Sequence, residues 1–231
     1  MNKYSKLIAS IFFSLVGIYF SFNKVNYEKL MFHLFNVRLI PLSIGIFLLI
    51  SAAYLRALRW KYILKPIRNV STQILFGSVM IGYFGNNVLP FRLGELLRTH
   101  AVSSRYSIQF PKIFGTVILE RVIDLCSLIL IILIVAPWFP FQNANLKTGI
   151  LALVFFTTAL VISIIVFYHL GYVEKIKDWD LSKSEFGEKI FPFLENTFNG
   201  LTLLTKVNNF TGIVLTTAII WVFYLGSTYA V

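Results

Sequence analysis

Long apolar runs restrict the fold of this chain more than any other feature of its sequence. Runs such as 39–58 and 112–135 have the length of about 20 residues that a helix needs to cross a ~30 Å hydrocarbon core. Only helices satisfy their own backbone polar groups over such runs in lipid. Charged residues are 13% of the chain, whereas soluble domains have about 25%. We therefore expect an all-α, polytopic integral membrane bundle.

The net charge of +11 comes from basic residues that flank the apolar runs. This distribution follows the positive-inside rule, and it excludes nucleic acid as a partner, because a nucleic-acid binder gathers its cations on one soluble face. We interpret Arg56, Arg59 and Trp60 as a topology signal and interface anchor, with contact to lipid phosphates as the alternative. Cations after residue 55 place this end of the run, and with it the amino terminus, in the cytoplasm: Arg56, Arg59, Lys61, Lys65 and Arg68.

The same rule organises the remaining chain into one domain, 1–231, in the cell membrane. We expect segment 23–38 to lie at the interface and 171–208 to form a cytoplasmic loop. That loop carries an interfacial helix, interrupted near Pro192, with Ile190, Leu194, Phe198 and Leu201 at helical spacing. The last apolar run stops without a flanking charge, so truncation at the carboxy terminus stays open. About five full spans are expected: 1–22, 39–58, 112–135, 148–168 and 210–231.

Segment 72–104 does not fit a simple span. If 72–89 crossed the membrane fully, the cations that follow it, such as Arg105 and Lys112, would lie outside. A helix that enters, breaks at Pro90 and returns keeps both ends cytoplasmic, and such broken helices line cavities. We therefore predict a re-entrant broken helix pair. Small residues in its first half, Gly77, Ser78, Gly82 and Gly85, allow a neighbouring helix to pack closely.

Charge is concentrated where this pair returns. On a helix that begins near Pro90, Arg92, Glu95 and Arg98 share one face. Two guanidiniums are suited to a phosphate, while Glu95 holds an arginine or accepts from an ammonium group. The alternative is an amphipathic interfacial helix with exposed ion pairs. Asn87 belongs to the same polar stretch.

A second charged cluster, Glu120, Arg121 and Asp124, lies two to three turns inside the run 112–135. Each charge costs roughly 2.5–3.5 kcal/mol near the bilayer centre, so these residues face protein or water. They form either a structural salt bridge between helices or the wall of a cavity that meets a charged headgroup.

No metal, cofactor or catalytic motif is recognisable. His33, His100 and His169 are far apart and lack metal-ligand spacing, and neither a phosphate-binding glycine loop nor a nucleophile elbow occurs. We interpret His100 as a packing residue. The single cysteine, Cys126, excludes an intramolecular disulfide.

The stretch from Asn87 to Arg98, NVLPFRLGELLR, resembles the N-x-x-P-x-R-x-G-E-x-x-R signature of a flippase-like membrane family. This family is named for the transmembrane region of lysylphosphatidylglycerol synthase (phosphatidylglycerol lysyltransferase). Arg56-x-x-Arg59-Trp60 before the signature and Glu120-Arg121-x-x-Asp124 after it fit in the same order. The resemblance covers about 40–130 by motif and the remainder by hydropathy.

The resemblance implies a multi-span protein of a bacterial or archaeal cytoplasmic membrane. In longer members this region is linked to moving a modified phospholipid between leaflets, and a separate soluble domain performs aminoacyl transfer. These 231 residues leave no room for that domain, so we expect a transporter-like protein. Its lipid-headgroup site comprises Asn87, Arg92, Glu95, Arg98, Glu120, Arg121 and Asp124.

The leading hypothesis is thus binding and translocation of an anionic or aminoacylated phospholipid, with Arg92 and Arg98 on the phosphate. The alternative is a membrane-embedded transferase, or its accessory subunit, acting on a phospholipid or a polyprenyl-phosphate-linked glycan with Glu95 or Asp124 as base. A third interpretation is an assembly partner whose ion clusters only hold helices together. The partners expected are phospholipids or polyprenyl-phosphate lipids and a separate transferase, and a homo-oligomer is compatible with the sequence.

Overall fold

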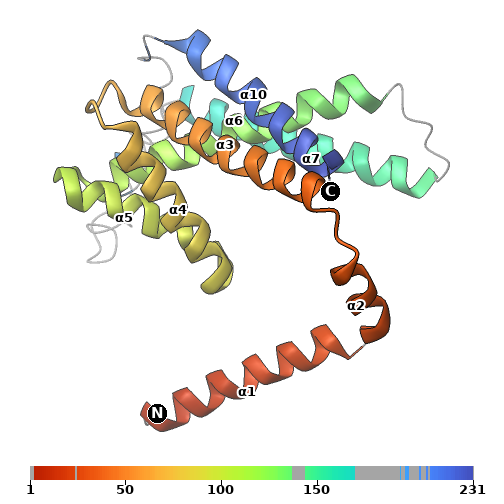
Figure 1. Cartoon of the computed structure of the whole chain (residues 1–231). Coiled ribbons are helices and arrows are strands. Elements are labelled where there is room, and N and C mark those ends of the chain that lie inside the picture. The colour runs from red at the N-terminus through yellow and green to blue at the C-terminus, as the bar shows by residue number, and fades with distance from the viewer. Residues whose placement is uncertain are drawn as a thin grey trace.

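The computed structural model describes residues 3–23, 25–136, 144–169 and 209–230, together with 193, 196–197, 203 and 207 (Figure 1). This part of the chain consists of helices and their connections, and it contains no strand. The expected all-helical architecture is therefore confirmed for the described residues.

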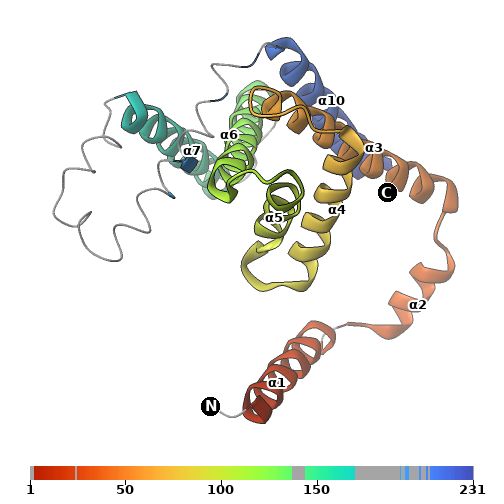
Figure 2. The same ribbon diagram turned by 90° about the vertical axis from the view of Figure 1, so that its left-hand side faces the viewer.

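Two long helices, α3 (Leu39–Leu64) and α10 (Phe210–Ala230), lie side by side and run in opposite directions (Figures 1 and 2). Arg59 contacts Thr217 near one end of the pair, and Gly226 faces Leu48 near the other. Within the described residues, these are the two helices that are long and apolar enough to cross a membrane. The number of spans in the whole chain stays a prediction.

The remaining long helices are α1, α6 and α7. Helix α6 (Phe110–Val135) packs against α3 and α5, and α7 (Ala144–His169) packs against α6. Helices α1 (Lys3–Phe22) and α2 (Tyr27–Phe35) stand away from the others in both views (Figures 1 and 2). The amino end of α2 is capped by Asn26, whose Oδ1 accepts a hydrogen bond from the backbone N–H of residue 29 at 3.1 Å.

A broken helix pair follows α3. Helix α4 (Thr72–Val88) ends at Leu89, and a single 3₁₀ turn, η1 (Pro90–Arg92), leads into α5 (Gly94–Tyr106). Proline explains the break, because it lacks a backbone N–H and disfavours helical dihedrals in the residue before it. Leu89 is accordingly extended, with φ −94° and ψ 143°. Helix α5 then runs back along α4 (Figure 2). We call α4, η1 and α5 the hairpin.

Glycines allow the two helices of the hairpin to touch backbone to backbone. A Cβ added to Gly94 would lie 2.0 Å from the carbonyl oxygen of Gly82, and one added to Gly85 would lie 2.7 Å from Cα of Gly94. The Gly94 N–H also donates to Oδ1 of Asn86 at 3.0 Å. The prediction of close packing at Gly82 and Gly85 is thus confirmed, whereas that for Gly77 is wrong, because a Cβ there meets open space.

The outer surface of the bundle is strongly apolar. Large hydrophobic side chains are exposed on α3 and on α10, among them Phe47, Ile50, Val222 and Leu225. Exposed apolar surface on this scale indicates a face that meets lipid or another protein. The buried core lies instead at the end of α3, where Trp60, Ile63 and Leu64 contact the neighbouring helices: Leu75, Val79, Val102, Ile113, Val117 and Ile213 complete it.

Three boundaries differ from the sequence predictions. Helix α3 continues beyond residue 58 to Leu64, because Arg59 and Trp60 are buried in the bundle and extend the helix instead of ending it. The helix expected from Pro90 begins only at Gly94, because Phe91 adopts a left-handed conformation with φ 57°. Segment 23–38, expected as an interfacial loop, contains α2, in which no described side chain is buried.

The interfacial helix predicted on Ile190, Leu194, Phe198 and Leu201 falls outside the described residues, as does Pro192. Most of the loop 171–208 and the tip of the loop after α6 also fall outside them. The interfacial helix and the cytoplasmic loop 171–208 therefore stay predictions.

Candidate functional site

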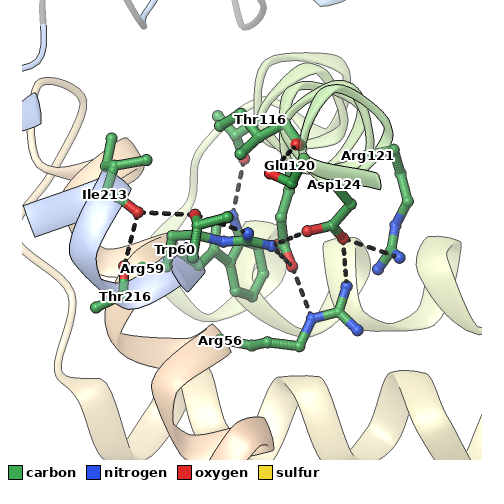
Figure 3. Close-up of polar contacts among 12 residues, drawn as sticks. Arg56, Arg59, Trp60, Thr116, Glu120, Arg121, Asp124, Ile213 and Thr216 are labelled. Carbon is green, nitrogen blue, oxygen red and sulfur yellow. Dashed lines mark hydrogen bonds and ion pairs between the residues drawn. The ribbon is translucent and has the colours of Figure 1, made fainter. Parts of the chain in front are cut away.

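A buried carboxylate on α6 is the centre of the polar interior (Figure 3). Glu120 is fully buried, and three arginines converge on it. Oε1 accepts from Nε of Arg56 at 3.1 Å and from Nη2 of Arg59 at 3.2 Å. Oε2 accepts from Nη2 of Arg98. Because these arginines come from α3 and α5, a single α6 carboxylate connects three helices.

One turn further along α6, Asp124 shares two of these arginines. Its Oδ1 lies 2.7 Å from Nη2 of Arg59, and its Oδ2 lies 2.9 Å from Nη2 of Arg56. The spacing of four residues places both carboxylates on one face of the helix, opposite the two arginines of α3. The result is a grid of charge-assisted hydrogen bonds between α3 and α6, visible in Figure 3.

The edge of the network is more open than its centre. Oε1 of Glu95 on α5 forms an ion pair with Nη2 of Arg121 at 2.9 Å, and Nη1 of Arg121 lies 3.4 Å from Oδ2 of Asp124. The side chain of Arg121 is 39% exposed, while those of Glu95 and Asp124 are 24% and 23% exposed. We call Glu95, Arg121 and Asp124 the rim, and Arg56, Arg59, Arg98 and Glu120 the inner cluster.

Hydroxyl and aromatic groups complete the inner cluster. Nη1 of Arg56 donates to the hydroxyls of Tyr83 and Tyr224 at 3.1 and 3.3 Å, which brings α4 and α10 into the network. Nη1 of Arg59 donates to Thr217 at 3.1 Å. The guanidinium of Arg98 lies 4.3 Å from the ring centre of Trp60, a cation–π distance.

Trp60 is itself fixed, because its Nε1 donates to Oγ1 of Thr116 at 2.9 Å. This hydrogen bond fixes the indole ring against which the Arg98 guanidinium packs. A planar guanidinium between a ring and a carboxylate keeps little rotational freedom, so the Arg98 side chain is held as part of the scaffold.

Among the described residues, the charges of the network do not cancel. Four guanidiniums face three carboxylates in the ion pairs, which leaves one unit of positive charge. An uncompensated buried charge is costly, so this excess favours an anion or water at the partly exposed rim.

Five of the seven residues predicted from the sequence meet in this network: Glu95, Arg98, Glu120, Arg121 and Asp124. Asn87 does not join them, because it is exposed and its Nδ2 donates to the backbone oxygen of Tyr83 at 2.8 Å. The side chain of Arg92 lies outside the described part of the structure, and its backbone belongs to η1. Asn87 thus lies in α4, before the break, and Arg92 lies in the 3₁₀ turn, so neither belongs to the helix that carries Glu95.

Comparison with known proteins gives the family. The profile described as "Lysylphosphatidylglycerol synthase TM region" matches residues 7–231. The chain belongs to this family. A transmembrane region therefore extends over nearly the whole chain, in agreement with the two long apolar helices and with the resemblance seen in the motifs.

A further match is to "Glycosyltransferase AglD" of Haloferax volcanii, which is 33% identical over 75 residues. These residues are 32% of this chain and 12% of that relative, so this lysylphosphatidylglycerol synthase TM region protein shares one short stretch with it. No solved structure matches the chain.

Two members of the network were not assigned to the site from the sequence of this TM region protein. Arg56 and Arg59 were interpreted as a topology signal and interface anchor together with Trp60, but the structure buries all three side chains. A signal was present, because Ala52 and Ala53 precede Arg56 by four and three residues and so lie on its helix face. Small residues on the face that carries a charge indicate a helix surface packed against protein.

The chemistry available to this TM region protein is that of anion recognition. Within the described residues, no group of three or more His, Cys, Asp or Glu side chains is placed to hold a metal ion. Guanidiniums present planar, directed donors that fit phosphate oxygens, and carboxylates beside them accept from ammonium or hydroxyl groups. The rim offers both kinds of group on adjacent helices.

Proposed function

We propose that this protein binds the headgroup of an anionic or aminoacylated phospholipid at the rim and carries it between leaflets. The observation that supports this function most strongly is the network of four guanidiniums and three carboxylates inside a bundle with an apolar exterior. Ionisable groups at membrane depth belong to substrate pathways more often than to sites without a function. The acyl tails would remain in lipid while the headgroup follows the polar rim.

The proposed topology has five full spans, one hairpin that re-enters the membrane, and both chain segments next to the hairpin in the cytoplasm. Nη1 of Arg68, in the connection before α4, lies 3.4 Å from the backbone oxygen of Tyr106 at the end of α5. The two ends of the hairpin therefore lie together, as a re-entrant element requires. Exposed cations at both ends favour the cytoplasmic side, which also places the amino terminus there.

In this function the three rim residues have complementary roles. Arg121 presents donors to the phosphate, because it is the most exposed arginine of the network. Glu95 and Asp124 accept from an ammonium or hydroxyl group of the headgroup. Arg98 and Glu120 act from behind the rim, since their charged groups are buried and paired with each other.

The experiment that tests the proposal is lipid translocation in proteoliposomes. Fluorescent phosphatidylglycerol, its lysyl derivative and a polyprenyl phosphate are offered to the wild type and to Arg121→Gln. We expect faster crossing with the wild type and a loss of at least tenfold with Arg121→Gln. Lys29→Gln is the matched control, because it removes one exposed cation from α2, outside the network. Equal rates with and without folded wild-type protein would reject translocation.

A second candidate function is supported by the match to a protein named as a glycosyltransferase. The chain would then be a membrane-embedded transferase, or an accessory subunit of one, acting on a phospholipid or a polyprenyl-phosphate-linked glycan. Glu95 or Asp124, both partly exposed, would be the candidate base. A radiolabelled lipid product formed by the purified protein would favour this function over translocation.

A further inference from the structure

Arg121 differs from the other three arginines of the network in its partners and in its exposure. Its Nη2 lies 2.9 Å from Oε1 of Glu95, its Nη1 lies 3.4 Å from Oδ2 of Asp124, and its side chain is 39% exposed. Arg56, Arg59 and Arg98 instead hold fully or mostly buried ion pairs. Arg121 is therefore the arginine that can change partners without leaving a buried charge unpaired.

Glu95 occupies the place on Arg121 that an external anion would take. Its carboxylate comes from α5 and reaches across to α6, so it connects the hairpin to the rest of the bundle. Oε1 makes the contact with Arg121, whereas Oε2 has no hydrogen bond within the described residues.

A second partner for Glu95 is already next to it. Nε of Arg98 lies 3.5 Å from Oε2 of Glu95, three residues along the same helix, and this Nε also lacks a hydrogen-bond partner among the described residues. A small change in the Glu95 side chain would convert this ion pair into a hydrogen bond. The carboxylate can thus leave Arg121 and stay paired, which makes the exchange inexpensive.

We propose that Glu95 is an internal competitor for the anion site on Arg121, and that headgroup binding moves Glu95 from Arg121 to Arg98. The inference rests on the proposed function, because it assumes that Arg121 receives the headgroup phosphate. It adds that, in the protein without lipid, the Glu95 carboxylate occupies the anion site on Arg121. Binding then removes one of the two ion-pair links between α5 and α6, leaving Arg98 with Glu120, and so loosens the hairpin.

The competition predicts a gain of affinity on removal of the competing charge. Binding of short-chain phosphatidylglycerol is measured in detergent for the wild type, Glu95→Gln, Arg121→Gln and the double variant. We expect Glu95→Gln to bind about threefold to fivefold more tightly, the range that a partly exposed ion pair supports. Arg121→Gln should bind at least tenfold more weakly, and the double variant should bind as weakly as Arg121→Gln.

Glu28→Gln is the control, because it removes one exposed carboxylate from α2 and so changes the net charge equally. Its affinity should equal that of the wild type. Equal or weaker binding by Glu95→Gln than by the wild type would overturn the competition. A gain that persists in the double variant would also overturn it, since the gain must depend on Arg121.

A second measurement follows the hairpin directly. Spin labels are placed on Cys126, which is exposed on α6, and on His100→Cys on α5. The sequence interpretation of His100 as a packing residue is wrong, because the structure leaves this side chain exposed. We expect phosphatidylglycerol to change the distance distribution in the wild type, and Glu95→Gln to show that change without lipid. Lipid binding with an unchanged distribution in both proteins would overturn the release of the hairpin. A wild type that binds no phospholipid would instead reject the proposed function itself.

Discussion

The α3–α10 pair and the hairpin are both antiparallel helix pairs, but different contacts hold them together. Between α3 and α10, a Cβ added to Gly226 would lie 3.3 Å from the end of a flexible side chain, Cδ1 of Leu48. In the hairpin, a Cβ on Gly94 would meet the backbone oxygen of Gly82 at 2.0 Å. Side chains can adjust to a substitution, whereas two backbones cannot.

This difference means that the α3–α10 pair tolerates substitutions, whereas the hairpin positions its residues accurately. The long pair needs length and an apolar exterior, which many sequences provide. The hairpin needs particular small residues and a particular break, because it holds Glu95 and Arg98 against α6. The ion network is the connection between the two, and its loss should disturb both.

The largest effect is expected from removing that connection. Glu120→Gln leaves Arg56, Arg59 and Arg98 without their shared buried carboxylate, and breaking a buried ion pair costs on the order of 3–5 kcal/mol. We expect a large drop in the thermal midpoint of unfolding in detergent, or the loss of the monodisperse peak in size-exclusion chromatography. An unchanged midpoint would show that the network does not hold the two pairs together.

A smaller but still large effect is expected from Gly94→Ala. The added methyl group has no room beside Gly82, and overpacking of this kind costs about 1–3 kcal/mol. The thermal midpoint should fall, because α5 must move away from α4. Normal stability would mean that the close backbone contact is not needed.

The same change at Gly77 tests whether position or glycine itself matters in the hairpin. A Cβ there meets no atom within 4 Å, so Gly77→Ala should gain up to about 1 kcal/mol from helix propensity. The thermal midpoint should stay level or rise slightly. A fall as large as that of Gly94→Ala would contradict the assignment of the contact to Gly94.

The smallest effect is expected in the long pair. With Gly226→Ala, the end of the Leu48 side chain must move by a few tenths of an ångström, and the gain in helix propensity offsets much of that cost. The thermal midpoint should change by less than a degree or two. A strong destabilisation would mean that the long pair is packed as closely as the hairpin.

Much of this arrangement could be predicted from the sequence, because hydropathy and charge act over long stretches. The apolar runs gave the positions of α3, α6, α7 and α10, and Pro90 gave the break in the hairpin. The carboxylates of α6 were expected to face protein or water because charge is costly in lipid. The buried contact of Glu120 with Arg98 shows that Glu120 faces protein.

What could not be predicted depends on contacts between distant parts of the chain. Arg56 and Arg59 are buried because their face of α3 packs against α6. That packing brings together distant parts of the chain, so no local sequence pattern predicts it. The positive-inside rule placed these arginines at the membrane surface. The left-handed conformation of Phe91 makes α5 begin after Arg92, so Arg92 does not share a helix with Glu95. This break could not be predicted, because a positive φ at a bulky residue is not expected from propensity.

The unmatched positive charge of the network has an electrical consequence. A single charge that moves through the full membrane potential exchanges about 2.3 kcal/mol with each 100 mV. Among the described residues, the empty network carries one excess positive charge, so in the proposed translocation any displacement of it along the field is coupled to voltage. With a singly charged phosphate bound, the total is zero and that coupling disappears. The loaded protein would then move without electrical work, while the empty one would return under the influence of the resting potential.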